Sequence, residues 1–226
     1  MKFAIYTAIF GNYDNLKEPI KQDINCDFIL FSDKLYPGSN SLWKRRNIQF
    51  SEMMSPRANS KLPKLIPHKY LADYDYVLWV DGQVQITSPN YLSLFLDSVD
   101  GLKQFVILKH WFRDCIYQEY EAFKTEQPER YVGCLDQVDS YRNSGFPEHA
   151  GLFATTSILR SIKDKNVKLL DENWYMEESR WVLFSGKSSD QISLAYTVYS
   201  LDFYDKMAYV NESDWRSSMQ LVAHNR

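Results

Sequence analysis

Short apolar runs alternate with polar stretches along the 226 residues of this chain. Unbroken runs of this kind are typical of strands that are buried on both faces. Five strands are expected on this basis, at residues 2–10, 27–31, 76–80, 105–108 and 151–155. Shorter edge strands are expected at residues 48–50 and 84–86, and the tail beyond Asp205 is expected to pack back on the sheet as strand or loop.

Capping residues and apolar residues spaced three or four apart predict the helices. They are expected from Ser55, from Ser88, over residues 116–124, 130–142 and 157–163, and from Ser188. Pro63 and Pro67 are expected to divide the first of these into two short pieces. Ser188 and Gln191 match a capping box for the last.

This alternation of strands and helices predicts an α/β fold. We expect residues 1–226 to form one domain, with a mostly parallel central sheet covered by helices on both faces.

Composition narrows the function classes. The net charge of −3 argues against a nucleic-acid partner. The three cysteines form no CxxC spacing, which is typical of a reducing compartment. There is no apolar run of about 20 residues, so no membrane span is expected. Residues 2–6 are typical of a strand rather than a secretion signal. We therefore expect a cytoplasmic protein, either free or peripheral at the inner face of a membrane.

Polar residues recur where the expected strands end. The set is Thr7 with Asn12 and Asp14, then Asp33, Asp81 and His110. If these strands are parallel neighbours, the residues share the sheet edge at which open α/β folds bind ligands. Each residue alone is more often a turn residue, so the hypothesis depends on their co-occurrence.

Arg57, Lys61 and Lys64 fall on one face of the first expected helix. Such a face can bind a diphosphate, because cations oppose its charge and Arg can donate two parallel hydrogen bonds to it. The alternative is an ordinary solvated charged face.

Asp81 is a candidate ligand for Mn²⁺ or Mg²⁺, which prefer oxygen ligands. An Asp-x-Asp arrangement would need an acid at position 83, where the chain has Gln83, and a haloacid-dehalogenase-type site has the same defect. His149 or His224 could complete a metal site, although a lone histidine is more often structural.

Three further groups are candidates for chemistry. Glu148 and His149 precede small Ala150 and Gly151, which would let a ligand approach the backbone. Asp190 begins the last helix and could be a general base or a ligand for an acceptor hydroxyl. Arg113 with Glu119 could be a buried ion pair or an acceptor clamp.

The chain has none of the common motifs of other enzyme classes. It has no P-loop, no GxGxxG after the first strand, no GxSxG and no HExxH.

Several stretches together resemble the glycosyltransferase-like family of plant mucilage and turgor-regulation proteins, whose bacterial relatives lie among surface-polysaccharide genes. The matching stretches are residues 6–14, 57–61, 67–71, 79–82, 109–119, 141–142 and 145–148. More distantly, residues 189–191 resemble the late Asp-Gln motif of the glycogenin and lipopolysaccharide-galactosyltransferase group.

The resemblance implies a GT-A fold and sugar transfer from a nucleotide-diphosphate donor, with a UDP-sugar as the expected donor. By this analogy Thr7, Ala8, Tyr13 and Asp33 would hold the base and ribose. Arg57 and Lys61 would meet the diphosphate or the donor sugar, and Asp81 with His224 would bind Mn²⁺ or Mg²⁺. We expect the acceptor, a glycan or lipid-linked glycan, to bind at His110, Arg113, Glu119 and His149. Because Gly82-Gln83 replaces the second acid, metal dependence stays open.

The function hypothesis is therefore a glycosyltransferase of surface glycan synthesis, such as lipopolysaccharide or capsule. An inverting enzyme would need Asp190 or Glu148 as base, and a retaining one could use Gln191 near the anomeric carbon. One alternative is a nucleotidyltransferase, but residues 11–14 lack the basic loop of that class. The other is a degenerate domain that binds a glycan or a partner.

Overall fold

The computed structural model describes residues 1–49, 54–185 and 188–223. Its strands in chain order are β1 (Phe3–Ile9), β2 (Asp27–Ser32), β3 (Trp43–Arg45), β4 (Tyr76–Val80), β5 (Val84–Ile86), β6 (Phe105–Lys109), β7 (Phe153–Ser161), β8 (Met207–Tyr209) and β9 (Met219–Leu221). Its α-helices are α1 (Pro56–Leu65), α2 (Tyr91–Leu96), α3 (Ile116–Glu126), α4 (Pro128–Gly133), α5 (Leu135–Asn143), α6 (Lys165–Ser185), α7 (Asp190–Ser200) and α8 (Glu212–Ser218). Two single 3₁₀ turns lie at Pro67–Lys69 and Tyr204–Lys206.

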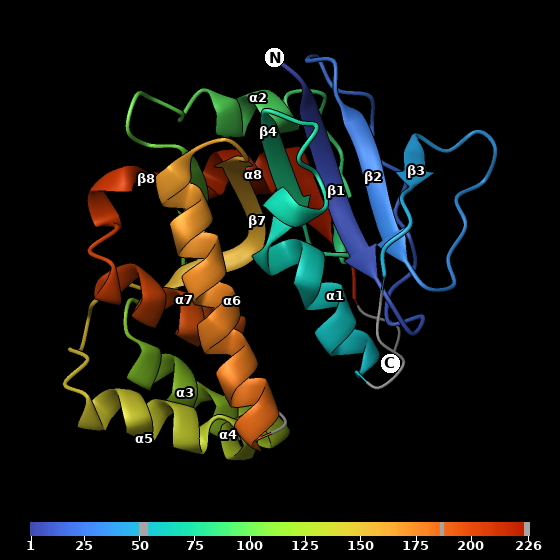
Figure 1. Cartoon of the computed structure of the whole chain (residues 1–226). Helices are drawn as coiled ribbons and strands as arrows, with labels where there is room; N and C mark the ends of the chain where they lie inside the picture. Colours follow the sequence, from blue (N-terminus) through green and yellow to red (C-terminus); the bar gives the residue numbers. More distant parts are fainter. Residues whose placement is uncertain (50–53, 186–187, 224–226) are drawn as a thin grey trace.

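Seven of the described strands form the central sheet, in the order β3-β2-β1-β4-β7-β6-β8 (Figure 1). Only β7 runs against both of its neighbours, β4 and β6, and the other described pairs are parallel. The prediction of a mostly parallel sheet is confirmed. The tail beyond Asp205 packs back on this sheet as expected, because β8 pairs with β6. Its second strand, β9, forms a separate antiparallel pair with β5.

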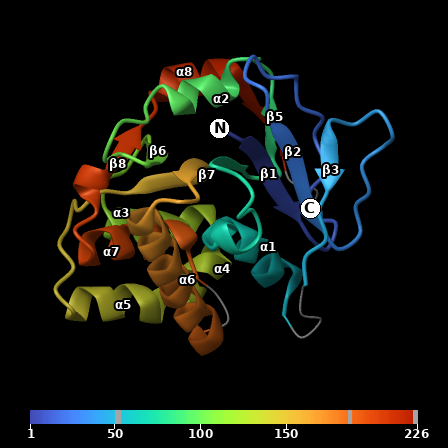
Figure 2. The ribbon, with the colours of Figure 1, turned by 45° about the horizontal axis from the view of Figure 1, so that its top comes forward.

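Helices cover both faces of the sheet, as expected. Figure 2 shows α2 and α8 on one side of the strands and α1, α6 and α7 on the other. Each face has its own apolar core, because alternate residues of a buried strand point to opposite faces. Tyr6 and Trp79 belong to the core under α1, α6 and α7, whereas Ile5 and Leu78 belong to the core under α2 and α8.

Residues 157–185 show the largest difference between the predicted and the observed secondary structure. Residues 157–163 were expected to be helical, but Ser157 continues β7 to Ser161, and the long helix α6 follows. Asp164 directly precedes this helix, and its carboxylate accepts from the Val167 backbone N–H at 2.9 Å. It presents Leu170, Trp174 and two buried acids, Asp171 and Glu178, to the core, and those acids interrupt the apolar pattern of the sequence.

Smaller corrections concern element boundaries. The edge strand expected at residues 48–50 lies instead at Trp43–Arg45; Ile48 and Gln49 are in no strand, and Phe50 is outside the described residues. α1 runs through Pro63 without a break and ends only before Pro67. α2 begins after Asn90, two residues beyond the expected Ser88 start.

The capping box expected at Ser188 is wrong, since the helix begins one residue later. The Ser188 hydroxyl donates to Glu178, and the Gln191 side chain donates to the Phe153 carbonyl at 3.4 Å. Both side chains therefore form hydrogen bonds with neighbouring elements, α6 and β7, and not with the backbone of the first turn of α7.

Candidate active site

A buried lysine joins the ends of three elements at the carboxyl edge of the sheet. Lys64, in the last turn of α1, is 5% exposed. Its ammonium donates to Asp190 Oδ2 at 2.7 Å, to Asp81 Oδ1 at 3.2 Å and to Thr155 Oγ1 at 3.3 Å. A lysine ammonium has three N–H donors, so all three are used. We call Lys64, Asp81, Thr155 and Asp190 the Lys64 cluster.

Asp81 is fixed by β4 and by a distortion of β7. The Trp79 indole N–H donates to Asp81 Oδ1 at 2.7 Å, and the Asp81 backbone N–H donates to the Thr156 carbonyl at 2.9 Å. The β6–β7 register shifts between Ile107, which pairs with Ile158, and Leu108, which pairs with Ala154. This bulge takes Thr155 out of regular pairing, and bulges of this kind often re-aim side chains beside active sites.

Two glycines allow loops to close around Asp81. A Cβ on Gly82 would lie 2.7 Å from Asp14 Oδ2, so the loop after β1 packs directly on the turn after β4. Gly11 has φ of +64°, and a Cβ there would lie 2.8 Å from the Pro56 side chain at the start of α1. Only glycine fits both close approaches without movement of a neighbour.

Asp190 is the first residue of α7 and is buried against α6. The Trp174 indole N–H donates to its backbone carbonyl at 3.1 Å. Burial alone would raise the pKa of the Asp190 carboxyl, but Lys64, Lys61 and Arg130 together lower that pKa well below its usual range. Burial alone would lower the pKa of Lys64, but Asp190 and Asp81 raise it above its usual value. The pair is therefore ionised at neutral pH.

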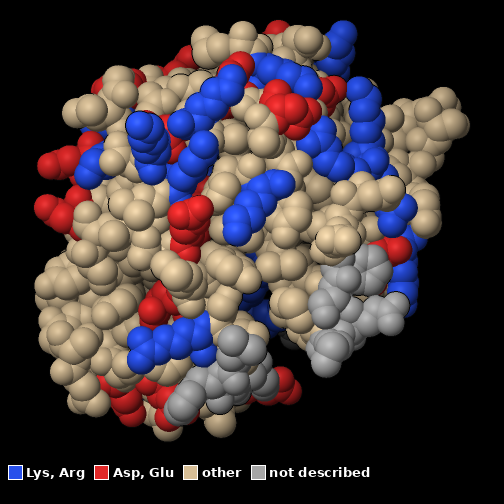
Figure 3. Space-filling model, viewed as in Figure 1, with Lys and Arg blue, Asp and Glu red and all other residues tan. Residues whose placement is uncertain are grey.

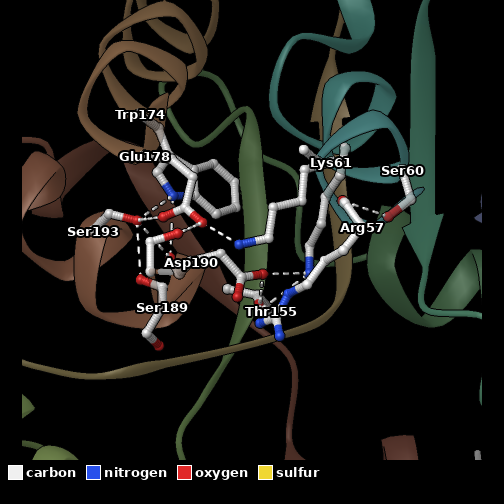
Figure 4. A network of polar contacts seen from close by, with 12 residues as sticks. Arg57, Ser60, Lys61, Thr155, Trp174, Glu178, Ser189, Asp190 and Ser193 are labelled. Carbon is white, nitrogen blue, oxygen red and sulfur yellow. Dashed lines mark hydrogen bonds and ion pairs between the residues drawn. The ribbon is translucent and has the colours of Figure 1, made fainter. Parts of the chain in front are cut away.

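A second buried ion pair lies beside the Lys64 cluster. Lys61, one turn earlier in α1, contacts Glu178 of α6 (Figure 4). The hydroxyls of Ser188 and Ser193 also donate to Glu178. Sequence reasoning missed Glu178 because it missed α6, although the absence of Pro and Gly over residues 164–185 is a signal of a helix.

The basic face of α1 thus divides into buried and exposed parts. Lys64 and Lys61 are engaged by acids, whereas Arg57 is exposed in the first turn. The Ser55 hydroxyl caps this turn by accepting from the Ala58 N–H at 3.2 Å. The space-filling view shows basic side chains inside a hollow between the lower parts of α1 and α6 (Figure 3).

The predicted donor-binding residues surround the same edge. Thr7 and Ala8 lie within β1 itself rather than in the loop after it, and both are buried. Tyr13, in that loop, is 57% exposed. Asp33, just after β2, accepts from the Gly11 backbone N–H at 3.1 and 3.2 Å. Their role in donor binding stays a prediction.

The predicted acceptor-binding residues lie two strands away, where β6 ends. Arg113 donates to Glu119 at 2.7 Å and to Glu126 at 2.6 Å. His110 Nδ1 accepts from the Arg113 backbone N–H at 3.1 Å, and burial lowers the pKa of this imidazole. His149 contacts Asp114 at 2.6 Å. Glu148 and His149 line a pocket near the carboxyl end of α7, whereas Asp190 is at its amino end.

The described residues alone do not provide the donor set of a metal ion. No group of three or more His, Cys, Asp or Glu with suitable geometry is found in residues 1–49, 54–185 and 188–223. Lys64 also places a positive charge 3.2 Å from Asp81 Oδ1, which opposes a second cation there. His224, the other predicted ligand, is outside the described residues.

The family of the chain follows from its match to one family model. The TOD1/MUCI70 glycosyltransferase-like domain matches residues 1–224. The chain belongs to this family. The TOD1/MUCI70 assignment agrees with the resemblance of the sequence motifs and places the Lys64 cluster in a glycosyltransferase-like domain.

Two similar proteins extend this assignment. The chain is 25% identical over 250 residues to the "Probable hexosyltransferase MUCI70" of Arabidopsis thaliana, a match that covers 99% of the chain and 40% of that protein. It therefore spans less than half the length of this relative. The solved structure of galactosyltransferase LgtC, in complex with donor and acceptor sugar analogs, matches with a TM-score of 0.50 at 14% identity, over 92% of this chain and 73% of that one. This likeness shows that the fold is of the GT-A type.

In the part of the chain that the structure describes, the helices are too short or too polar to cross a bilayer.

Proposed function

We propose that this domain transfers a sugar from a nucleotide-diphosphate donor to a hydroxyl group of a glycan acceptor. The observation that carries the proposal is the Lys64 cluster, in which two acids and a lysine meet at the carboxyl edge of a GT-A-type sheet. Ligands of open α/β sheets bind at this edge. Asp81 is the most exposed of the three charged groups, with 26% of its side chain accessible.

The leaving nucleotide diphosphate would be stabilised by the cations of α1. Charge develops on this group as the glycosidic bond breaks, and fixed positive charges are effective there because they need no reorganisation. Figure 4 shows Arg57 and Lys61 extending from α1 toward the side on which Asp190 lies. Arg57 is the exposed member and is the residue we assign to the diphosphate.

A buried hydroxyl beside Asp190 also supports a ligand at this point. The Ser189 hydroxyl oxygen is buried and has no hydrogen-bond partner among the described residues. Buried hydroxyls are normally paired, and a donor sugar or an ordered water could supply the partner.

Asp190 is better suited to orienting a sugar hydroxyl than to removing a proton. A carboxylate whose pKa lies well below its usual range is a weak base at neutral pH. Its Oδ2 already accepts from Lys64 and from the Thr155 hydroxyl at 3.2 Å. We therefore assign Asp190 to donor-sugar orientation and leave Gln191 as the residue for a retaining route. Glu148 lines the pocket at the other end of α7, away from the Lys64 cluster, and is not assigned the role of base.

The proposal is tested by measuring nucleoside diphosphate release from a panel of nucleotide-sugars, with and without acceptors. We expect release from at least one UDP-sugar and a loss of about 100-fold or more in Asp190→Asn, because an oriented electrostatic contact is removed. Asp97→Asn, a change at an exposed acid at the end of α2, is the matched control.

Two other outcomes would favour the alternative functions. Nucleotide binding without any turnover would favour a non-catalytic binding domain. Release of pyrophosphate from a nucleoside triphosphate and a sugar phosphate would favour a nucleotidyltransferase.

A further inference from the structure

A pocket of about 620 Å³ lies beyond the Lys64 cluster, at the side of the sheet formed by β6 and β8. Its walls are the end of β6, the loop before β7, the carboxyl end of α7 and β8. The partly exposed rings of Tyr204 and Tyr209 supply aromatic surface, and the buried ring of Phe153 lies beneath them. Lys109, Glu148 and His149 supply polar groups.

The aromatic walls are held in fixed positions. The rings of Phe153 and Tyr209 are nearly parallel, with centroids 6.3 Å apart and planes 10° apart. The Lys109 ammonium lies 4.7 Å from the centroid of the Tyr209 ring. The Tyr204 hydroxyl donates to the Ala150 carbonyl at 2.7 Å, which fixes its ring against the loop before β7.

That loop has an unusual backbone. His149 has φ of +57° and Gly151 has φ of +96°, so two residues of a three-residue stretch adopt left-handed conformations. The Gly151 N–H donates to the Asp114 carbonyl at 2.9 Å, and the His149 ring contacts the Asp114 carboxylate at 2.6 Å. A non-glycine residue held in this region is uncommon, and such residues cluster at ligand sites.

The pocket and the Lys64 cluster lie at the same edge of the sheet. β6 runs parallel to β4 with β7 between them, so Lys109 at the end of β6 and Asp81 after β4 are about two strand spacings, or about 10 Å, apart. Phe153 lies two residues before Thr155, about 7 Å along a strand, and both side chains face α7. The Gln191 side chain bonds the Phe153 carbonyl. From Asp190 to Tyr199, at the far wall of the pocket, α7 rises about 14 Å.

The charges around the pocket are nearly balanced. The Arg113 guanidinium is held by Glu119 and Glu126, and His149 is paired with Asp114. Aromatic faces with balanced donors and acceptors suit a neutral, hydroxyl-rich ligand, because the C–H face of a sugar ring packs on an aromatic ring while its hydroxyls bond polar groups at the rim.

We propose that this pocket is a remote acceptor subsite, which binds sugar units of an uncharged oligosaccharide beyond the unit that receives the transferred sugar. The inference rests on the proposed function for the direction of the chain, but binding in the pocket is separately measurable. An oligosaccharide that runs along the carboxyl edge of the sheet from Tyr209 toward Asp81 would bring its terminal unit to the Lys64 cluster, so the acceptor is an oligosaccharide rather than a single sugar.

The test measures binding and transfer in Tyr209→Leu, which removes the ring and hydroxyl and keeps apolar bulk. Tyr36→Leu, at a 73% exposed tyrosine, is the matched control. Cellotriose, xylotriose, mannotriose and β-1,4-galactotriose are titrated by NMR saturation transfer and calorimetry, with circular dichroism and melting temperature as checks of folding. Nucleoside diphosphate release is measured with water, with monosaccharides and with the trisaccharides as acceptors.

We expect at least one trisaccharide to bind the unchanged protein and the Tyr36→Leu protein, and about tenfold weaker binding by Tyr209→Leu. Donor hydrolysis and transfer to monosaccharides should be the same in all three proteins, while KM for the trisaccharide rises in Tyr209→Leu. If none of the trisaccharides binds, or if Tyr209→Leu binds them equally well, the subsite is overturned. If binding depends on Tyr209 but no nucleotide-sugar is turned over, the pocket stands and the proposed function fails.

Discussion

Lys64 Nζ lies 2.7 Å from Asp190 Oδ2, although the two residues are 126 positions apart in the chain. Their side chains are 7% and 11% exposed, so this is a buried ion pair. It joins α1 to the start of α7, and through Asp81 it also joins both helices to the end of β4. One lysine therefore holds together the three elements that form the candidate active site.

Removing this lysine should destabilise the fold. Lys64→Met leaves Asp190 buried without its nearest cation, and breaking a buried pair by removing one partner costs about 3–5 kcal/mol. The free energy of unfolding from urea titration measures this cost. Lys69→Met, at an exposed lysine in the following 3₁₀ turn, should change stability by less than about 0.5 kcal/mol. Equal stabilities of the two variants would mean that Lys64 contributes little.

Stability should also depend on pH through Asp190. Its pKa in the folded protein lies below the unfolded value, which is about 3.9, so its contribution is present above pH ~4 and is lost as pH falls further. Lys64 has a raised pKa when folded, so its contribution is present below about pH 10.4 and is lost as pH rises through the folded value.

The contribution of Asp190 is measured from the urea concentration at the midpoint of unfolding, at a series of pH values from ~6 down to ~2. Asp190→Asn should lose less stability over this range than the unchanged protein. Other paired acids, such as Asp73 with its lowered pKa, titrate in both proteins and cancel in the difference. Parallel curves for the two proteins would show that Asp190 is not held in its charged form by folding.

Donor binding should persist without a metal ion. The charge of a diphosphate can be opposed by Arg57 and by the lysines of α1, and Lys64 stands beside Asp81, where a cation was expected from the sequence. Calorimetric titration of UDP in EDTA should give a Kd within about threefold of that in Mn²⁺. A strict requirement for Mn²⁺ would restore the metal hypothesis, with Asp81 and His224 as the ligands to substitute next.

The sequence predicts the strands and helices correctly where the buried positions hold apolar residues and the exposed positions hold polar ones. β1, β2, β4 and β6 are largely apolar, and the sequence predicts them close to their observed bounds. The prediction failed at α6, because Asp171 and Glu178 occupy core-facing positions that the apolar pattern assigns to solvent. Asp171 is tolerated there because buried Arg160 donates to it at 2.9 Å, a partner that lies in β7.

The candidate site was predictable residue by residue but not as a cluster. Asp81 and Asp190 stand out at a strand end and a helix start, and Lys64 belongs to the basic face of α1. Their contact depends on the β7 bulge and on the order of the strands, which are tertiary properties. The basic face of α1 is partly buried because other elements pack against it. Two of its three cations, Lys61 and Lys64, are therefore paired with acids instead of being solvated.

The most direct test of the donor site is a thermal-shift titration with UDP on the unchanged protein and on Arg57→Gln. Arg57 is exposed in the first turn of α1, so the variant should fold. We expect UDP, and a UDP-sugar more strongly, to raise the melting temperature of the unchanged protein. The shift should be clearly smaller in Arg57→Gln, which loses the charge assigned to the diphosphate. The absence of a shift with every nucleoside diphosphate, with or without Mn²⁺, or equal shifts in both proteins, would contradict a donor site at the Lys64 cluster.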